Sequence, residues 1–220
     1  INMRATTFAA LGVALLAGSV LSECVGGRFD SVDSCYTTFM DGYGLVSPPL
    51  PEYWAFHNVR MGWLNEQGMA VQQKICDIGN GLVDCMQPQW DCVDPATFMA
   101  MGQNSSDAAN YMTDLYVTQY QCSPRGLQII FKTFDCMVAA RSQGGQDSQD
   151  ACDAALAKDM AGGDICGSFN KYLTCMYNIY VPFCGPDAGE FMCGTTRAGI
   201  MAGGGAACDN AGMLNKCPGT

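Results

Sequence analysis

Fourteen cysteines constrain how this chain can fold more than any other feature. All of them follow an apolar N-terminal segment. Disulfides persist in oxidising compartments and are rare in cytosolic proteins, and an even number of cysteines suits a closed disulfide framework. We therefore predict a secreted, extracellular protein in which all of these cysteines form disulfides. They are Cys24, Cys35, Cys76, Cys85, Cys92, Cys122, Cys136, Cys152, Cys166, Cys175, Cys184, Cys193, Cys208 and Cys217.

The N-terminal segment has the form of a secretory signal peptide. Arg4 supplies a positive charge, and residues 8–17 are an apolar run. Such a run is long enough for a signal-peptide core but too short to cross about 30 Å of hydrocarbon. Cleavage after Ser19 or after Ser22 fits the small residues that follow, and we favour Ser22. The sequence thus predicts a signal peptide over residues 1–22, with a buried N-terminal helix as the alternative, and no membrane span.

The net charge limits which classes of macromolecule the chain is expected to bind. The formal net charge is −10, and the eleven Lys and Arg residues are scattered singly. An acidic chain without a basic stripe is repelled by phosphate backbones. We therefore predict no nucleic-acid partner and weak attraction to anionic membranes, and the acidity is explained by solubility alone.

The spacing of the cysteines indicates two related halves. Two cysteines separated by eight residues (C-x8-C) occur five times, and aligning Cys85 with Cys175 brings further features into register. The aligned segments are 76–92 on 166–184, 93–99 on 185–192, and 28–35 on 130–136. We interpret them as two diverged copies of one module, with chance similarity as the alternative. Module 1 spans residues 23–122 with six cysteines and module 2 spans residues 123–220 with eight, so each could close its own disulfides.

Apolar residues recur at helical spacing along the whole mature chain, and sustained period-two alternation is absent. Two examples are the sets Phe29, Val32, Tyr36, Phe39, Met40 and Leu127, Ile130, Phe131, Phe134, Val138. Ser123-Pro124 is a helix start, with Ser as N-cap and Pro in the first helical position. The sequence therefore predicts an all-α, disulfide-rich fold of stacked helices.

Several helix boundaries follow from local signals. Ser106 or Asp107 is expected to cap a helix that carries Met112 and Leu115. A helix that begins near Cys166 is expected to end before Pro182, and the glycine pairs and triplets fall between helices as loops.

The C-x8-C spacing has a geometric consequence for disulfide pairing. Nine residues along a helix span about 13.5 Å and place the two side chains on opposite faces, whereas a disulfide needs Cα atoms within about 7 Å. Cys76 cannot pair with Cys85, nor Cys166 with Cys175, if each helix is continuous. Each such helix should be linked on two sides to two different neighbours. The rest of the pairing is left open, because six or eight cysteines allow many patterns.

The second half resembles the secreted, cysteine-rich helical domains of unknown function that are abundant in nematodes. The residues that carry the resemblance are Cys166, Phe169, Tyr172, Cys175, Cys184 and Gly185. The first half fits less well, since Val93 rather than glycine follows Cys92. The resemblance implies an extracellular helical domain and brings no activity or cofactor with it.

Residues that would mark an enzyme or a metal site are scarce. His57 is the one histidine, so any Ser-His-Asp or Cys-His system would have to use it. It stands beside Phe56, where a packed side chain is the simpler interpretation. Asp147, Asp150 and Asp153 are three residues apart, as on a helix face, and no C-x2-C pair suits zinc. We predict no catalytic residue, metal or cofactor.

One modification site stands out. Asn104-Ser105-Ser106 fits the N-glycosylation sequon and lies in a polar loop between two expected helices.

Two functions remain open. The first is a non-catalytic extracellular interaction or structural module that binds an unknown extracellular protein or glycan. The second is a carrier of a small apolar ligand, a lipid or sterol, in a helical cavity lined by methionine and aromatic side chains, although such side chains also fill ordinary cores. The carrier hypothesis rests on Phe98, Met99, Met101, Tyr111, Met112, Met137 and Met176.

Overall fold

The computed structural model describes residues 24 and 26–218, so the signal peptide expected over residues 1–22 lies outside the described residues. Within the part of the chain that the model describes, the regular structure consists of α-helices joined by turns and short 3-10 or π-helical segments, without β-strands. Disulfides link these helices to one another. The all-α, disulfide-rich fold that the sequence predicts is confirmed.

The tertiary contacts divide the chain into two compact units. Unit 1 ends at Cys122 and unit 2 begins at Ser123. Every disulfide closes within one unit, three in unit 1 and four in unit 2. Each unit therefore has its own covalent framework.

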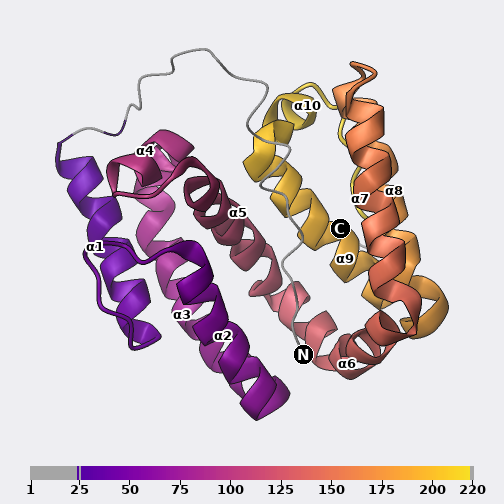
Figure 1. Ribbon diagram of the computed structural model, residues 1–220, viewed down its shortest axis with the longest axis horizontal. Helices are drawn as coiled ribbons and strands as arrows, with labels where there is room; N and C mark the ends of the chain where they lie inside the picture. Colours follow the sequence, from indigo (N-terminus) through magenta and orange to yellow (C-terminus); the bar gives the residue numbers. More distant parts are fainter. Residues whose placement is uncertain (1–23, 25, 219–220) are drawn as a thin grey trace. The chain divides into compact units, whose positions relative to one another are not determined.

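Unit 1 is built around one central helix. The helix α3 packs between α1 and α5, and α2 and α4 both pack on α5, as the indigo-to-magenta part of Figure 1 shows. The α-helices are α1 (Gly27–Gly42), α2 (Tyr53–Gln67), α3 (Gln72–Met86), α4 (Pro95–Ala100) and α5 (Ser105–Gln121). Short 3-10 segments at Gly68–Val71 and Gln87–Cys92 flank α3.

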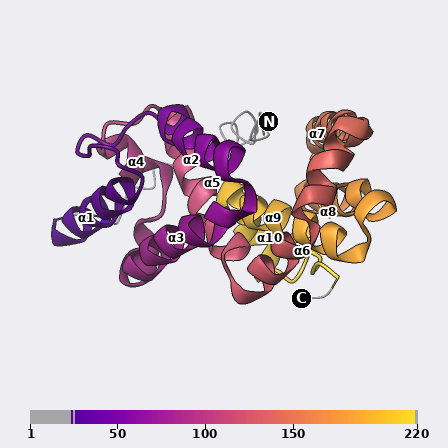
Figure 2. The same cartoon turned by 90° about the horizontal axis from the view of Figure 1, so that it is seen from below.

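Unit 2 has a comparable layout. The longest helix, α8, packs between α7 and α9, and α6 packs against both α8 and α9 (Figure 2). Its α-helices are α6 (Pro124–Ala140), α7 (Gln146–Met160), α8 (Ile165–Cys184), α9 (Pro186–Ile200) and α10 (Ala206–Asn210). Wide turns at Arg141–Gly145 and Met201–Gly205 each contain a glycine with positive φ, Gly144 and Gly204.

Two helix starts show how local chemistry sets the boundaries. Ser123 caps α6 as expected, since its hydroxyl accepts a hydrogen bond from Gly126 N at 3.0 Å. The expectation for α5 was wrong, because Asn104 is the cap. Its Oδ1 accepts from Ser106 N at 3.0 Å and from Asp107 N at 2.9 Å. Asp107 therefore lies in the first turn, where its negative charge interacts favourably with the positive end of the helix dipole.

The helix α8 also differs from expectation at its end. It continues through Pro182 to Cys184, and Gly185 closes it with φ 81° and a bond from its N–H to Val181 O at 3.0 Å. A proline so near the end of a helix removes only one hydrogen bond of the last turn. The disulfide between Cys184 and Cys136 on α6 holds that turn in place.

Close helix packing in unit 1 depends on a glycine. A Cβ atom added at Gly79 on α3 would lie 2.5 Å from Thr118 Cγ2 on α5, closer than the two atoms can approach. The side chain of residue 79 must therefore be absent for α3 and α5 to approach as they do. This approach lies beside the Cys76–Cys122 disulfide, which joins the same two elements.

Candidate functional site

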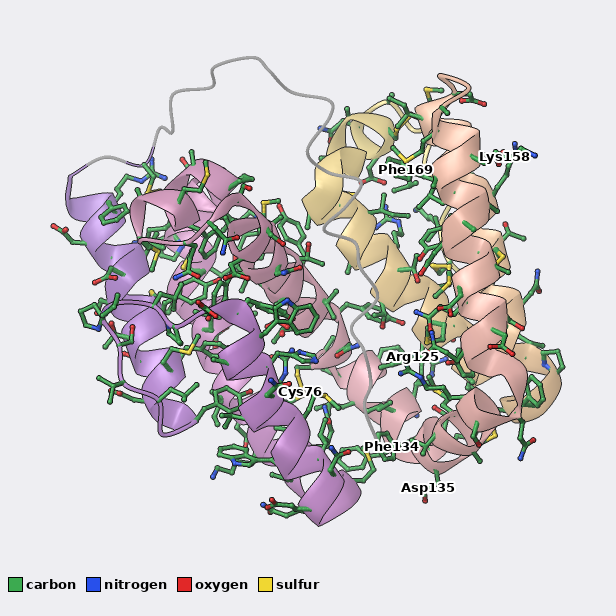
Figure 3. All side chains as sticks on the ribbon, in the orientation of Figure 1. Cys76, Arg125, Phe134, Asp135, Lys158 and Phe169 are labelled. Atoms are coloured by element: carbon green, nitrogen blue, oxygen red, sulfur yellow. A yellow bond between two sulfur atoms is a disulfide. The ribbon has the colours of Figure 1, made fainter. Side chains whose placement is uncertain are left out.

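The disulfides connect the two central helices to their neighbours on opposite sides. In unit 1, Cys76 on α3 pairs with Cys122 at the end of α5, and Cys85 pairs with Cys35 on α1. Figure 3 labels Cys76 at this junction. None of the three C-x8-C pairs within α3 and α8 bonds internally, as the helix geometry requires. The remaining pairs are Cys24–Cys92, Cys136–Cys184, Cys152–Cys175, Cys166–Cys208 and Cys193–Cys217.

The order of pairing is the same in both units. In unit 1 the first cysteine pairs with the fifth, the second with the fourth and the third with the sixth. With Cys193–Cys217 set aside, the six other cysteines of unit 2 follow this order. In this order Cys35 corresponds to Cys152, whereas the resemblance between segments 28–35 and 130–136 would place Cys35 on Cys136.

An asparagine occupies the same position in each central helix. Asn80 lies four residues after Cys76, and its Nδ2 donates to the carbonyl of Cys122 at 3.3 Å. Asn170 lies four residues after Cys166, donates to the carbonyl of Met213 at 2.7 Å and accepts from the N–H of residue 215 at 2.8 Å. Both amides hold the main chain at or shortly after the sixth cysteine of the pattern. The sequence signal for this role is a C-x3-N spacing that occurs in both halves.

A polar cluster is buried between α2 and α5 of unit 1. Arg60 Nη1 donates to Asp114 Oδ2 at 2.9 Å, and Arg60 Nη2 donates to Oδ1. The side chains are 14% and 7% exposed. The hydroxyl of Tyr53 donates to Asp114 Oδ1 at 3.2 Å. His57 Nδ1 lies 3.5 Å from both Arg60 Nη2 and Tyr53 Oη, so the single histidine is packed against the ion pair.

Aromatic rings surround this cluster and complete the core of unit 1. Tyr36 contacts the rings of Phe98 and Tyr111 edge-on, at centroid distances of 5.2 and 5.9 Å. The rings of Phe56 and Tyr111 are stacked 6.0 Å apart, and the guanidinium of Arg60 lies 4.9 Å from the centroid of Phe56. Edge-to-face and cation–π geometries of this kind add to the free energy gained from burial.

Burial also alters the proton affinities of the cluster. It raises the pKa of Tyr43 to about 12 and raises the pKa values of Tyr36, Tyr53 and Tyr111, each with an added contribution from the negative charge of Asp114. Burial alone would lower the pKa of Arg60, but Asp114 and the nearby tyrosines raise it above its ordinary value. The tyrosines therefore stay neutral and Arg60 stays charged throughout the physiological pH range.

Unit 1 is expected to unfold at alkaline pH. A tyrosine whose folded-state pKa lies above its ordinary value of about 10 stabilises the fold below that value and loses this contribution as the pH rises. For Tyr43 the loss is about 1.4 kcal/mol per pH unit between about pH 10 and its folded-state pKa. The part of the tyrosinate absorbance due to the buried tyrosines of unit 1 should change together with tryptophan fluorescence, in one cooperative step. Titration of every tyrosine near pH 10 with unchanged fluorescence would contradict this expectation.

Unit 2 has a corresponding ion pair between α6 and α9. Arg125 donates to Glu190 through Nε at 2.7 Å and through Nη2 at 2.6 Å, and the side chain of Glu190 is 6% exposed. Figure 3 labels Arg125. In each unit, an arginine on a flanking helix thus forms a bidentate pair with a buried acid on the neighbour of the central helix. Sequence reasoning missed both pairs, because their partners are 54 and 65 residues apart and no local pattern links them.

The residues of the carrier hypothesis do not come together at one place. Phe98, Met101, Tyr111 and Met112 are buried in unit 1, and Met99, also in that unit, is 45% exposed. The other two methionines, at positions 137 and 176, belong to unit 2. The seven side chains therefore do not surround a single enclosed volume within either unit.

The remaining candidate residues are exposed or partly exposed. Asn104 is exposed at the start of α5. On α7, Asp150 accepts a hydrogen bond from Gln146, and Asp153 accepts one from the hydroxyl of Tyr172 at 2.5 Å. Among residues 24 and 26–218, there is no group of three or more His, Cys, Asp or Glu side chains that could hold a metal ion.

Within those same residues, the search for a helix long and apolar enough to cross a membrane found none. Comparison of the chain with protein-family models, with curated proteins and with solved structures found no match. What the chain does is therefore inferred from its own geometry.

Proposed function

We propose that this chain is a secreted, disulfide-stabilised helical protein that acts as a non-catalytic extracellular interaction or structural module. One observation carries the proposal: all fourteen cysteines are paired, and the pairs close two separate units in the same order. A framework of this density suits an oxidising compartment. The partner would be an extracellular protein or a glycan.

The two units are proposed to be diverged copies of one module. The shared pairing order supports this, as do the asparagines Asn80 and Asn170, each four residues after the third cysteine of its unit. A third parallel is a buried acid between the fifth and sixth cysteines of the shared pattern, Asp114 on α5 and Glu190 on α9, each of which pairs with an arginine. In this interpretation Cys193–Cys217 is an addition specific to unit 2, where it fastens the segment after α10 to α9.

The carrier function is less well supported. A lipid or sterol carrier needs an enclosed apolar volume of several hundred Å³. The methionine and aromatic residues that suggested one are distributed over both units, and in unit 1 Tyr36, Phe98 and Tyr111 pack directly on one another.

Secretion is tested by expressing the full chain, with its own N-terminal segment, in eukaryotic cells. We expect the protein in the culture medium, with a mass lower than that of the reduced chain by fourteen hydrogens, because every cysteine is oxidised. Retention in the cytosol with reactive thiols would contradict the proposal. Native mass spectrometry of the same material tests the carrier function, since a bound lipid or sterol would appear as an added mass that is lost on denaturation.

Glycosylation at Asn104 can be tested without disturbing α5. Replacing Asn104 would remove the helix cap as well as the sequon, whereas the side chain of Ser106 is exposed and only its N–H contacts the cap. Ser106→Ala should therefore abolish the mass shift caused by glycosidase treatment and leave the free energy of unfolding within about 0.5 kcal/mol of the parent. An unchanged mass shift in Ser106→Ala would place the glycan elsewhere.

A further inference from the structure

The helix α6 has two opposite apolar faces. One face, with Ile129, Thr133 and Cys136, packs into unit 2, where Ile129 is 1% exposed and Cys136 is bonded to Cys184. The opposite face contains Leu127, Phe131, Phe134 and Val138. An ordinary surface helix has a single apolar stripe and a polar opposite face. The second stripe of α6 therefore needs a separate explanation.

Among the described residues, the second stripe is partly exposed. Phe131 is 50% exposed, and Leu127, Phe134 and Val138 are each partly exposed. Figure 3 labels Phe134 on this helix together with its neighbour, Asp135. We call the four apolar residues the α6 seam. A half-exposed phenylalanine in a row of apolar neighbours is a feature of protein interaction sites.

The spacing along the α6 seam is that of helix pairing. The steps between its residues are four, three and four, which is the alternation of the a and d positions in a coiled coil. The residues that face the core of unit 2, Ile129 and Cys136, occupy the f position, directly opposite the seam. The helix is therefore oriented so that its a and d positions point away from its own unit.

We propose that the α6 seam pairs with the same helix of a second copy of this chain, in antiparallel orientation. A two-fold axis between residues 132 and 133 would place Phe131 against Phe134 of the other copy, twice, with Leu127 against Val138 at each end. The seam is then complementary to itself, as a two-fold interface requires. Antiparallel helices also oppose their dipoles favourably.

The flanking polar residues agree with this orientation. Gln128 and Asp135 both occupy the e position and are both exposed, and in an antiparallel pair the e positions of the two helices meet. Gln128 Oε1 accepts from Arg125 Nη1 of its own helix at 3.1 Å, so its Nε2 would donate to the Asp135 carboxylate of the other copy, without like charges in contact. Lys132 points elsewhere, since its Nζ is 2.5 Å from Asp187 Oδ2 at the start of α9. This inference concerns self-association and does not depend on the identity of an extracellular partner.

Sedimentation equilibrium of the full, oxidised chain tests the proposal. We expect a reversible monomer–dimer equilibrium that Phe131→Glu weakens at least tenfold. Phe183→Glu is the matched control, because Phe183 is similarly exposed, at 46%, but lies on α8 outside the seam. The control should leave the dimer unchanged.

A gain of affinity tests the orientation. Gln128→Lys would place a positive charge beside Asp135 of the other copy only in the antiparallel dimer, so dimerisation should strengthen several-fold at low salt and lose this gain at high salt. Adding Asp135→Asn should abolish the gain. The proposal would be overturned if the chain stayed monomeric at millimolar concentration. That outcome includes the case in which another part of the chain covers the seam. A dimer that Phe131→Glu and Phe183→Glu weaken equally would also overturn the proposal.

Discussion

Replacing Asp114 by alanine is expected to lower the free energy of unfolding of unit 1 by about 3–5 kcal/mol. The substitution leaves the Arg60 guanidinium, whose side chain is only 14% exposed, without its counter-charge. The tyrosine that donates to Asp114, Tyr53, loses its acceptor as well. Urea unfolding followed by tryptophan fluorescence measures the effect on unit 1 alone, because Trp54, Trp63 and Trp90 all lie there.

An exposed ion pair in the same unit provides the control. The side chains of Arg28 and Asp91 are 41% and 54% exposed, and Asp91→Ala should cost about 0–1 kcal/mol. The double variant Arg60→Met/Asp114→Leu removes both buried charges together and should recover most of the loss. If Asp114→Ala cost no more than Asp91→Ala, the pair would not be the buried, desolvated contact described above.

Removing the Cys76–Cys122 disulfide, by changing both cysteines to alanine, is expected to destabilise unit 1 by about 4 kcal/mol. The bridge spans 46 residues. Closing a loop of that length lowers the conformational entropy of the unfolded chain, and loss of the bridge destabilises the fold by about that free energy. Both sulfur atoms belong to buried residues, 0% and 5% exposed. The fluorescence transition should move to much lower urea, whereas the part of the far-ultraviolet circular dichroism transition due to unit 2 should stay in place.

The reciprocal variant tests whether the units are independent. Changing Cys193 and Cys217 to alanine removes a bridge of unit 2 that spans 24 residues. The tryptophan transition should not move, since every tryptophan belongs to the other unit. A shift of that transition by more than about 0.5 kcal/mol would show that the stability of the two units is coupled.

The covalent constraints of the fold were largely predictable from the sequence. Cys76 and Cys85 lie too far apart on one helix to pair, so α3 had to be linked to two neighbours, as it is to α5 and α1. The helical periodicity identified most helices because each buries one face. The pairing order was not predictable, because spacing alone cannot distinguish Cys152 from Cys136 as the partner of Cys175.

Features that depend on contacts between distant segments were beyond sequence reasoning. Arg60 and Asp114 meet only because α2 packs on α5. The cap of α5 is a different case, since both Asn104 and Ser106 suit an N-cap and the backbone conformation selects the first. The expectation that α8 ends before Pro182 considered only the local effect of proline. The disulfide of Cys184, two residues later, fixes the last turn of α8.

Mapping the disulfides of the oxidised protein tests the central claim most directly. Proteolysis without reduction, followed by mass spectrometry, should recover seven linked peptide pairs, each within residues 24–122 or within residues 123–217. The pairs in both halves should follow the same order, with Cys193–Cys217 as the additional bridge. A free thiol or a bridge between the two halves would contradict an architecture of two separately closed units, and a different pairing order in either half would contradict the proposal that the units are related.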